Sequence, residues 1–232
     1  LDPSAIKAYD LHPVVSTANK TTRMMLGKVQ ILSARAYWDC ATGKLGGDDS
    51  AFSLMLDDSY GNYYWHVCTA LTGEYAEFAD TRNTKIISGQ VMQACELVKR
   101  FNIPSIIVET NGVGSFVPKL LRRALAQEGL RCGVIGQAAT GNKNERILSG
   151  LEPLIKSGVL WAHVDVLNGS LWDEMKDWKP DVRNQPDGYL DSGAGAALAA
   201  PVRIGQMVRN PTSTTDEHWQ PNSGVFEVTL EE

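Results

Sequence analysis

Three strand-like segments follow one another at short intervals, and this spacing constrains the fold more than any other feature of the sequence. They lie at residues 28–39, 50–56 and 63–71 and are rich in apolar and aromatic residues. A glycine-rich turn and an Asp/Asn-containing turn separate them, a pattern typical of neighbouring antiparallel strands. The sequence therefore predicts an antiparallel meander at the start of the core.

Helical and strand-like patterns alternate after this meander. Helices are predicted over residues 86–98, 116–127, 144–156 and 186–200, and strands over residues 105–109, 131–135 and 159–161. Three antiparallel strands followed by strands that alternate with helices predict an α/β fold. Its mixed sheet would be covered by helices on both faces.

The length of the chain suits one main domain with short additions. Its 232 residues, 43% of them hydrophobic, are enough to bury one sizeable core, which we place at residues 31–203. Residues 1–30 carry little periodicity and are predicted to be an arm or linker. Residues 204–232 are mostly polar and punctuated by proline, which predicts a flexible tail.

Composition excludes several classes of protein. The four cysteines never form C-x-x-C and the four histidines are scattered, so neither a zinc site nor a disulfide framework is predicted. The sequence has no run of 18 apolar residues and no secretory signal, which argues against a membrane span or secretion. A net charge of -5 argues against a protein that coats nucleic acid over its whole surface, although local basic patches are present.

Carboxylates stand where the predicted fold would bring them together. Asp39 ends the first long strand, and Glu109 directly follows the buried run at 105–108. Sites in open α/β sheets form outside the carboxyl ends of the strands, so both acids would lie at one edge. Asp191 lies four residues after Asp187 at the start of the last helix, and the small residues that follow would let this helix approach the sheet closely.

Three converging carboxylates without a histidine suit a hard divalent cation. Mg²⁺ and Mn²⁺ prefer oxygen ligands, and either would offset the repulsion among acids that are held close together. Each acid alone has an ordinary interpretation as a turn former or a helix cap. Their combination in this order favours a metal site formed by Asp39, Glu109 and Asp191.

This order of motifs resembles the nuclease domain of the large terminase subunits of tailed bacteriophages, a member of the RNase H-like superfamily. The resemblance covers about residues 30–203. It is carried by the strand that ends in Asp39 and by the segments Asp49-Ser-Ala-Phe, Glu109-Thr-Asn-Gly-Val-Gly, Asn142-Lys-Asn-Glu-Arg-Ile and Asp187-Gly-Tyr-Leu-Asp-Ser. It implies an RNase H-like mixed sheet, with three antiparallel strands followed by parallel strands and helices on both faces.

The resemblance also implies a site and a reaction. Asp39, Glu109 and Asp191 would be the catalytic metal ligands, with Asp187 as a further candidate ligand and Asp49 as a nearby acid. Two Mg²⁺ or Mn²⁺ ions, with Asp39 as the bridging ligand, would promote hydrolysis of phosphodiester bonds. The implied substrate is double-stranded viral DNA, cut with little sequence specificity when concatemers are packaged in the cytoplasm of the bacterial host.

Partners follow from the same resemblance. They are the portal protein, the small terminase subunit and the ATPase domain of the same full-length polypeptide. No G-x-x-x-x-G-K-[ST] motif occurs in the sequence, so we expect this chain to be the nuclease portion without ATPase activity. Four basic residues flank the acids in sequence order and are either phosphate contacts or ordinary solubilising charges: Lys143, Arg146, Lys179 and Arg183.

Other functions fit parts of the sequence. A junction resolvase or transposase core would use the same acids on branched or end-specific DNA. A docking module of a packaging assembly would keep the fold without catalysis. Gly112 and Gly114 after a strand also suggest a dinucleotide-binding oxidoreductase, but the third glycine of that motif is replaced by Val117.

Overall fold

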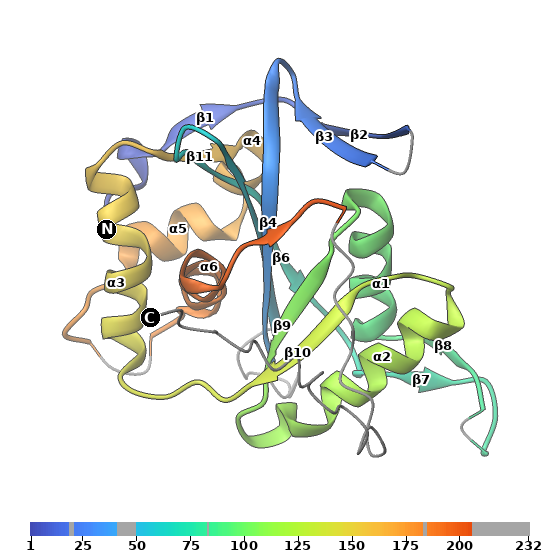
Figure 1. Ribbon diagram of the computed structural model, residues 1–232. Helices are drawn as coiled ribbons and strands as arrows, with labels where there is room; N and C mark the ends of the chain where they lie inside the picture. Colours follow the sequence, from blue (N-terminus) through green and yellow to red (C-terminus); the bar gives the residue numbers. More distant parts are fainter. Residues whose placement is uncertain (19–20, 41–49, 83, 183–184, 206–232) are drawn as a thin grey trace, which may run out of the picture.

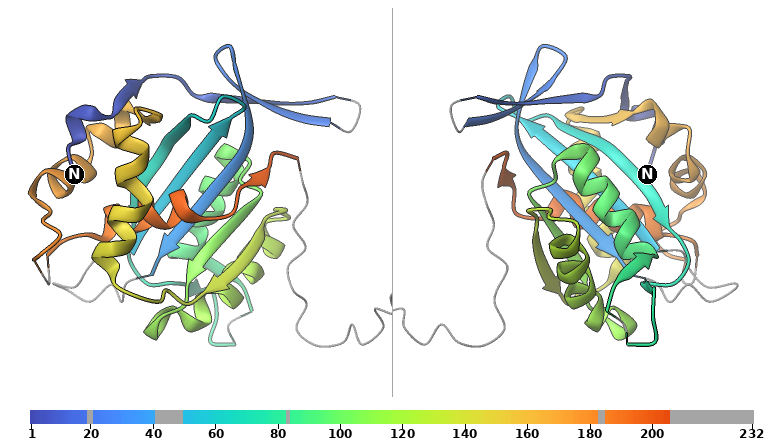
Figure 2. Two further views of the ribbon diagram at one scale, coloured as in Figure 1. Left: turned by 60° about the vertical axis from the view of Figure 1, so that its left-hand side comes forward. Right: turned by 90° about the vertical axis from the view of Figure 1, so that its right-hand side faces the viewer.

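The computed structural model describes residues 1–18, 21–40, 50–82, 84–182 and 185–205. One mixed sheet runs through the middle of the molecule, and helices cover both of its faces (Figures 1 and 2). The α/β fold predicted from the order of the segments is therefore confirmed.

The predicted meander forms the centre of the sheet. The strands in their spatial order are β1 (Lys7–Tyr9), β11 (Leu160–His163), β6 (Tyr63–Leu71), β5 (Ser50–Asp58), β4 (Val29–Asp39), β3 (Thr21–Leu26) and β2 (Pro13–Ala18). Strands β4, β5 and β6 pair antiparallel, as their short connections predict.

Two parallel strands extend the sheet beside β4. Strand β9 (Ser105–Glu109) pairs with the last part of β4, with Trp38 opposite Val108, and β10 (Gly133–Gln137) pairs with β9. Strand β12 (Val202–Arg203) pairs antiparallel with an earlier part of β4, at Ala34. Because β4 and β9 are parallel and in register, their carboxyl ends meet at the same edge of the sheet.

The helices form two layers (Figure 2). Helices α1 (Gln90–Phe101) and α2 (Val117–Gln127) cover one face, where Trp38 and Phe52 lie in the core. The second face carries α3 (Lys143–Lys156), α4 (Val164–Leu167), α5 (Ser170–Asp177) and α6 (Gly188–Leu198). The short elements η1 (Pro3–Ala5), η2 (Gly112–Phe116), β7 (Glu77–Phe78) and β8 (Ile86–Ser88) complete the described chain. None of the described helices has the length and apolar character that crossing a bilayer requires.

Helix α6 packs against the sheet at very short range. A Cβ atom added at Gly193 would lie 2.2 Å from the Trp65 ring, and one at Gly195 would lie 2.6 Å from the Tyr37 ring. On the other side of α6, Gly150 of α3 allows a similarly close approach to Ala194. The small residues of this helix therefore bring its backbone onto the aromatic rings of the sheet, as the sequence predicts.

Several predicted boundaries differ from the structure. Helix α6 begins at Gly188, with Asp187 as its N-cap residue, and not at Pro186. Ile86 lies in β8 and not in the first helix, because Gly89 adopts φ of 105° and separates the two elements. Helix α5 was not predicted from the sequence, although Leu171 and Met175 bury its apolar face at helical spacing.

The prediction that residues 1–30 form an arm or linker is wrong for the described part of this segment. Strand β1 pairs in parallel with β11, and β3 pairs with β4. Ile6, Met24 and Leu26 are buried, but so few buried hydrophobic positions give no extended periodic pattern over this segment. The predicted tail at 204–232 lies outside the described residues from position 206 onward.

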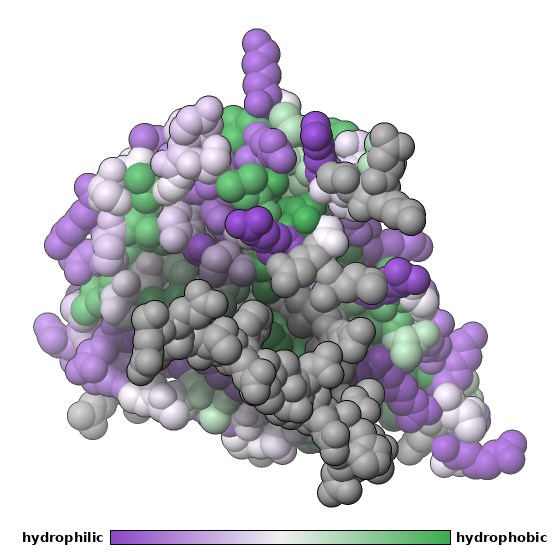
Figure 3. Space-filling model, viewed as in Figure 1, coloured by the Kyte–Doolittle hydropathy of each residue, from purple (hydrophilic) through white to green (hydrophobic). Residues whose placement is uncertain are grey.

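An aromatic cluster attaches this N-terminal segment to the sheet. The Tyr9 hydroxyl lies 2.8 Å from His66 Nδ1, and the His12 ring stacks on that of His163 at a centroid distance of 4.8 Å. Burial, together with His163 and His12, lowers the pKa of His66 to about 3, so its imidazole is neutral at physiological pH. On the face of the molecule drawn in Figure 3, hydrophilic and hydrophobic side chains of the described residues are interspersed.

We expect Gly193→Ala to destabilise the protein by about 1–3 kcal/mol or more, because the added methyl group has no space beside the rigid Trp65 ring. Chemical denaturation followed by circular dichroism would measure the change. Leu198→Ala, on the exposed side of the same helix, is the control and should change stability by no more than about 0.5 kcal/mol. Equal stability of Gly193→Ala and the unmutated protein would contradict the close packing.

Candidate active site

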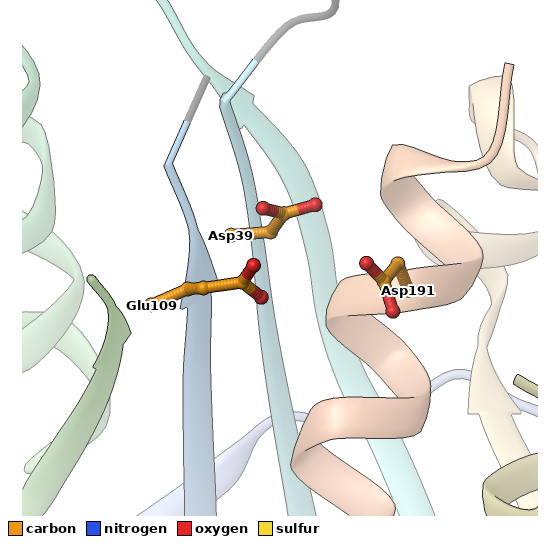
Figure 4. A group of neighbouring side chains, drawn as sticks. All are labelled: Asp39, Glu109 and Asp191. Atoms are coloured by element: carbon orange, nitrogen blue, oxygen red, sulfur yellow. The ribbon is translucent and has the colours of Figure 1, made fainter. Parts of the chain in front are cut away.

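Three carboxylates converge at the carboxyl ends of β4 and β9. Asp39 ends β4, Glu109 ends β9, and Asp191 projects from the first turn of α6. One oxygen from each lies within 4.8 Å of one from each of the others, and Figure 4 shows all three side chains directed toward a common space. Among the described residues, these acids form the group whose ligand atoms are close enough to share a metal ion. The structure thus brings together the three acids that the sequence singles out.

Neighbouring elements fix the orientation of Glu109. The Tyr37 hydroxyl donates a hydrogen bond of 2.8 Å to Glu109 Oε2, and Asn111 Nδ2 donates one of 3.1 Å to Oε1. Tyr37 precedes Asp39 by two residues on β4, and residues two apart point to the same face of a strand. Both carboxylate oxygens of Glu109 therefore have a donor that holds them in place.

Helix α5 fixes the start of α6 and hence Asp191. Glu174 accepts a hydrogen bond of 2.7 Å from the backbone N–H of Leu190, one of the first N–H groups of α6. Burial raises the pKa of Glu174 to about 7. The side chain of Asp191 is only 1% exposed, so its charge depends on nearby partners rather than on water.

Two cations at the start of α3 supply these partners. Arg146 donates to both oxygens of Asp191, from Nε at 2.8 Å and from Nη2 at 2.5 Å, and its Nη2 lies 3.4 Å from Glu109 Oε2. Lys143 Nζ lies 3.2 Å from Asp191 Oδ2 and 3.9 Å from Asp39 Oδ2. Lys143 and Arg146 are three residues apart and therefore project from the same side of the helix.

Asp39 is the acid at which the two cations offset burial and the repulsion from the other carboxylates only in part. Burial, together with the charges of Asp191 and Glu109, raises the pKa of Asp39 to about 7, while Lys143 and Arg146 act in the opposite direction. A carboxylate with this shift is costly to keep ionised unless positive charge is added. The arrangement therefore favours binding of a cation at Asp39.

The other predicted site residues lie at different distances from the three acids, and two of them are outside the described part of the chain. Asp187 Oδ1 accepts from Lys143 Nζ at 2.7 Å, so this acid pairs with a lysine beside the three-acid group. Lys179 makes no ion pair with these acids in the part of the chain that is described. It lines a neighbouring hollow of about 530 Å³ together with Asp173 and Glu174. Asp49 and Arg183 lie outside the described residues.

Tyr37, Asn111 and Glu174 were not singled out in the sequence as site residues. Of these three, only Tyr37 could have been identified from the sequence, because it lies two residues before Asp39 and so points to the same face of the strand. Lys143 and Arg146, which the sequence suggests as phosphate contacts, both contact the acids directly in the structure.

The donor set fits a divalent metal ion. It consists of carboxylate oxygens from three separate elements, without sulfur or imidazole, which suits Mg²⁺ or Mn²⁺ better than zinc. Glu109 is further oriented by two hydrogen bonds, as ligands at metal sites commonly are.

We expect Asp39→Asn to stabilise the metal-free protein at pH 8 by roughly 1–3 kcal/mol, because it removes a buried charge that is poorly compensated. In the unmutated protein, folded Asp39 retains a proton between about pH 4 and pH 7 that the unfolded chain releases. Stability should therefore fall as pH rises through that window, and the substitution should reduce this fall.

Thermal unfolding in EDTA between pH 5 and pH 8 would measure both effects. Asp177→Asn removes an exposed carboxylate on α5 and serves as the control for the change in net charge. A loss of stability in Asp39→Asn at pH 8 would contradict the electrostatic description of the site.

Three solved structures are similar to this chain to different degrees. The nuclease domain of the human cytomegalovirus terminase, in a manganese-soaked and inhibitor-bound form, matches with a TM-score of 0.50 at 10% identity, over 72% of this chain and 82% of that chain. The yeast mitochondrial Holliday junction resolvase Ydc2 matches at 0.41, with 11% identity over 72% of this chain and 75% of that chain. RuvC of Thermus thermophilus matches at 0.35, with 11% identity over 74% and 99% of the two chains. At 10% identity, the similarity to the terminase nuclease domain shows that the two chains share a fold.

Sequence comparison identifies the family. No curated protein sequence matches the chain. The family described as "Terminase Bacteriophage T7, Ribonuclease H-like domain" matches residues 39–160, slightly more than half of the chain. The match begins at Asp39 and includes Glu109. This chain therefore belongs to the family of bacteriophage T7-type terminase ribonuclease H-like domains.

Proposed function

We propose that this protein is a metal-dependent endonuclease that hydrolyses phosphodiester bonds of double-stranded viral DNA. The observation that supports this most directly is the convergence of Asp39, Glu109 and Asp191 at the strand ends of a terminase RNase H-like fold. The substrate would be concatemeric DNA, cut during genome packaging.

The three acids would hold two Mg²⁺ or Mn²⁺ ions, with Asp39 as the shared ligand and with Glu109 and Asp191 each binding one ion. When bound, such ions supply an activated water molecule and stabilise the leaving 3′-oxygen. Tyr37 and Asn111 would keep Glu109 in a fixed orientation during this reaction through their hydrogen bonds to its two oxygens. Arg146 would hold Asp191 in the same way.

Low sequence specificity follows from the chemistry of the contacts. The acids and metal ions would act on the phosphate backbone, which carries no direct information about sequence. Lys143 and Arg146 lie at the site and are the described basic residues best placed to contact the scissile phosphate or its neighbours. Lys179 and Arg183 are proposed as more distant phosphate contacts.

The family also suggests where the enzyme works. We place it at the packaging motor in the cytoplasm of the infected bacterium. Its proposed partners are the portal protein, the small terminase subunit and an ATPase domain of the same polypeptide. In this arrangement the present chain would supply the cutting activity and not ATP hydrolysis.

Conversion of supercoiled plasmid to nicked and linear forms tests the proposal. We expect cleavage with Mg²⁺ or Mn²⁺, no cleavage in EDTA, and a loss of more than about 100-fold in Asp39→Asn and Glu109→Gln, because each removes a charged metal ligand. Glu152→Gln neutralises an exposed acid on α3 that pairs with Lys156, and it should cut at the unmutated rate.

Cleavage that is insensitive to EDTA or to Asp39→Asn would refute the proposed mechanism. Folded protein with no activity on any DNA would favour a docking module. Strong preference for a four-way junction over linear duplex would favour a resolvase.

A further inference from the structure

We propose that Lys143 and Arg146 take the place of the metal ions while the site is metal-free, and that DNA phosphates draw at least Lys143 away. Metal binding and DNA binding would then strengthen each other. This inference rests on the proposed function, since it concerns how the same acids acquire their metal ions.

The two cations contact the three acids of the site and the neighbouring Asp187. Lys143 Nζ lies 3.9 Å from Asp39, 2.7 Å from Asp187 and 3.2 Å from Asp191. Arg146 completes the set through Asp191 and Glu109. Each of the three proposed metal ligands therefore already has an oxygen close to a protein cation.

Burial explains why these contacts form. The side chains of Asp39, Glu109 and Asp191 are 16%, 11% and 1% exposed, and carboxylates so far removed from water need nearby positive charge. The sequence provides it from α3, which lies beside α6 (Figure 1). Without metal ions, these cations supply the compensating charge that keeps the acids together.

The same contacts oppose metal binding. Both oxygens of Asp191 accept hydrogen bonds from Arg146, and Oδ2 also lies near Lys143. A divalent cation at these oxygens would face the ammonium and guanidinium charges at close range, and like charges in a site of low polarity repel strongly. Binding of metal ions therefore requires that at least one protein cation move.

Lys143 is the residue better suited to move. Its side chain is 38% exposed, against 17% for Arg146, and its ammonium group divides its contacts among three acids without a two-pronged pairing. Arg146 is instead held by a bidentate pair with Asp191. The long flexible stem of lysine allows its charge to swing toward a phosphate while its backbone stays in α3.

DNA would supply the alternative partner. A phosphate placed at the site would attract Lys143. The departure of Lys143 would remove one positive charge from beside Asp39 and Asp191, while Asp191 stays paired with Arg146. Because linkage is reciprocal, DNA would tighten metal binding by the same factor by which metal tightens DNA binding. The acids would then bind little metal until DNA lies at the site, so the enzyme would be inactive until its substrate is in place.

Calorimetric titration of Mn²⁺ into the full chain at pH 8 tests the exchange without measuring cleavage. Lys143→Gln should bind Mn²⁺ about tenfold more tightly than the unmutated protein in the absence of DNA, since it removes a competing charge. Lys156→Gln, an exposed lysine at the other end of the same helix, is the matched control and should bind as the unmutated protein does.

The second arm adds a short phosphorothioate duplex, chosen because it is hydrolysed slowly. The duplex should tighten Mn²⁺ binding to the unmutated protein several-fold and have a smaller effect on Lys143→Gln. Thermal unfolding of each variant in EDTA would verify that it is folded.

The outcomes separate this inference from the proposed function. If Mn²⁺ binds the unmutated protein, is lost in Asp39→Asn, and binds Lys143→Gln no more tightly, the exchange is wrong and the metal site stands. An absence of any DNA effect on Mn²⁺ affinity would also overturn the exchange. If the unmutated protein binds no Mn²⁺ with or without DNA, both the metal site and the exchange are refuted.

Discussion

The close contact between α6 and the sheet is the feature on which the site depends. Gly193 and Gly195 allow the helix backbone to lie against the rings of Trp65 and Tyr37, where any larger side chain would collide. This approach carries Asp191, two residues before Gly193, to the edge at which β4 and β9 end. Tyr37 contributes to both the packing of α6 and the geometry of the acids, because its ring lies against α6 and its hydroxyl orients Glu109. The packing of the core and the geometry of the acids are thus set by the same few contacts.

The close grouping of the acids lowers the stability of the metal-free protein. Three acids gather with little access to water, and the two cations of α3 compensate them only in part, as the raised pKa of Asp39 indicates. Such unfavourable electrostatics commonly mark functional sites, where stability is given up for chemistry. A divalent cation would relieve this repulsion. The raised pKa of Asp39 therefore indicates both a loss of stability without metal and a preference for binding a metal ion.

Much of this arrangement can be predicted from the sequence because it follows from local rules. The meander follows from strand patterns and short turns, and the meeting of Asp39 with Glu109 follows from their positions at the ends of two strands that prove to be parallel. The position of Asp191 follows from the run of small residues in its helix. These features depend on residues near one another in the chain, or on the general rule that sites form at strand ends.

Other features depend on distant contacts that have no local pattern. The pairing of Lys143 and Arg146 with the acids joins α3 to three other elements, and solvent-exposed charges at the same spacing would look identical in sequence. The strands before residue 30 were missed because few of their residues are buried, and their stability comes from pairing with β11 and β4. Helix α5 was missed although its apolar spacing is helical, and the role of its Glu174 at the start of α6 appears only in three dimensions.

The most direct measurement of the central claim is a crystal structure of the protein bound to a short phosphorothioate duplex and soaked in Mn²⁺, with anomalous diffraction recorded to locate the metal. We predict a peak among Asp39, Glu109 and Asp191, with oxygen ligands about 2.1 Å from the ion and with Lys143 displaced from Asp39. Anomalous density only at other sites, with the three acids still paired to Lys143 and Arg146, would contradict it.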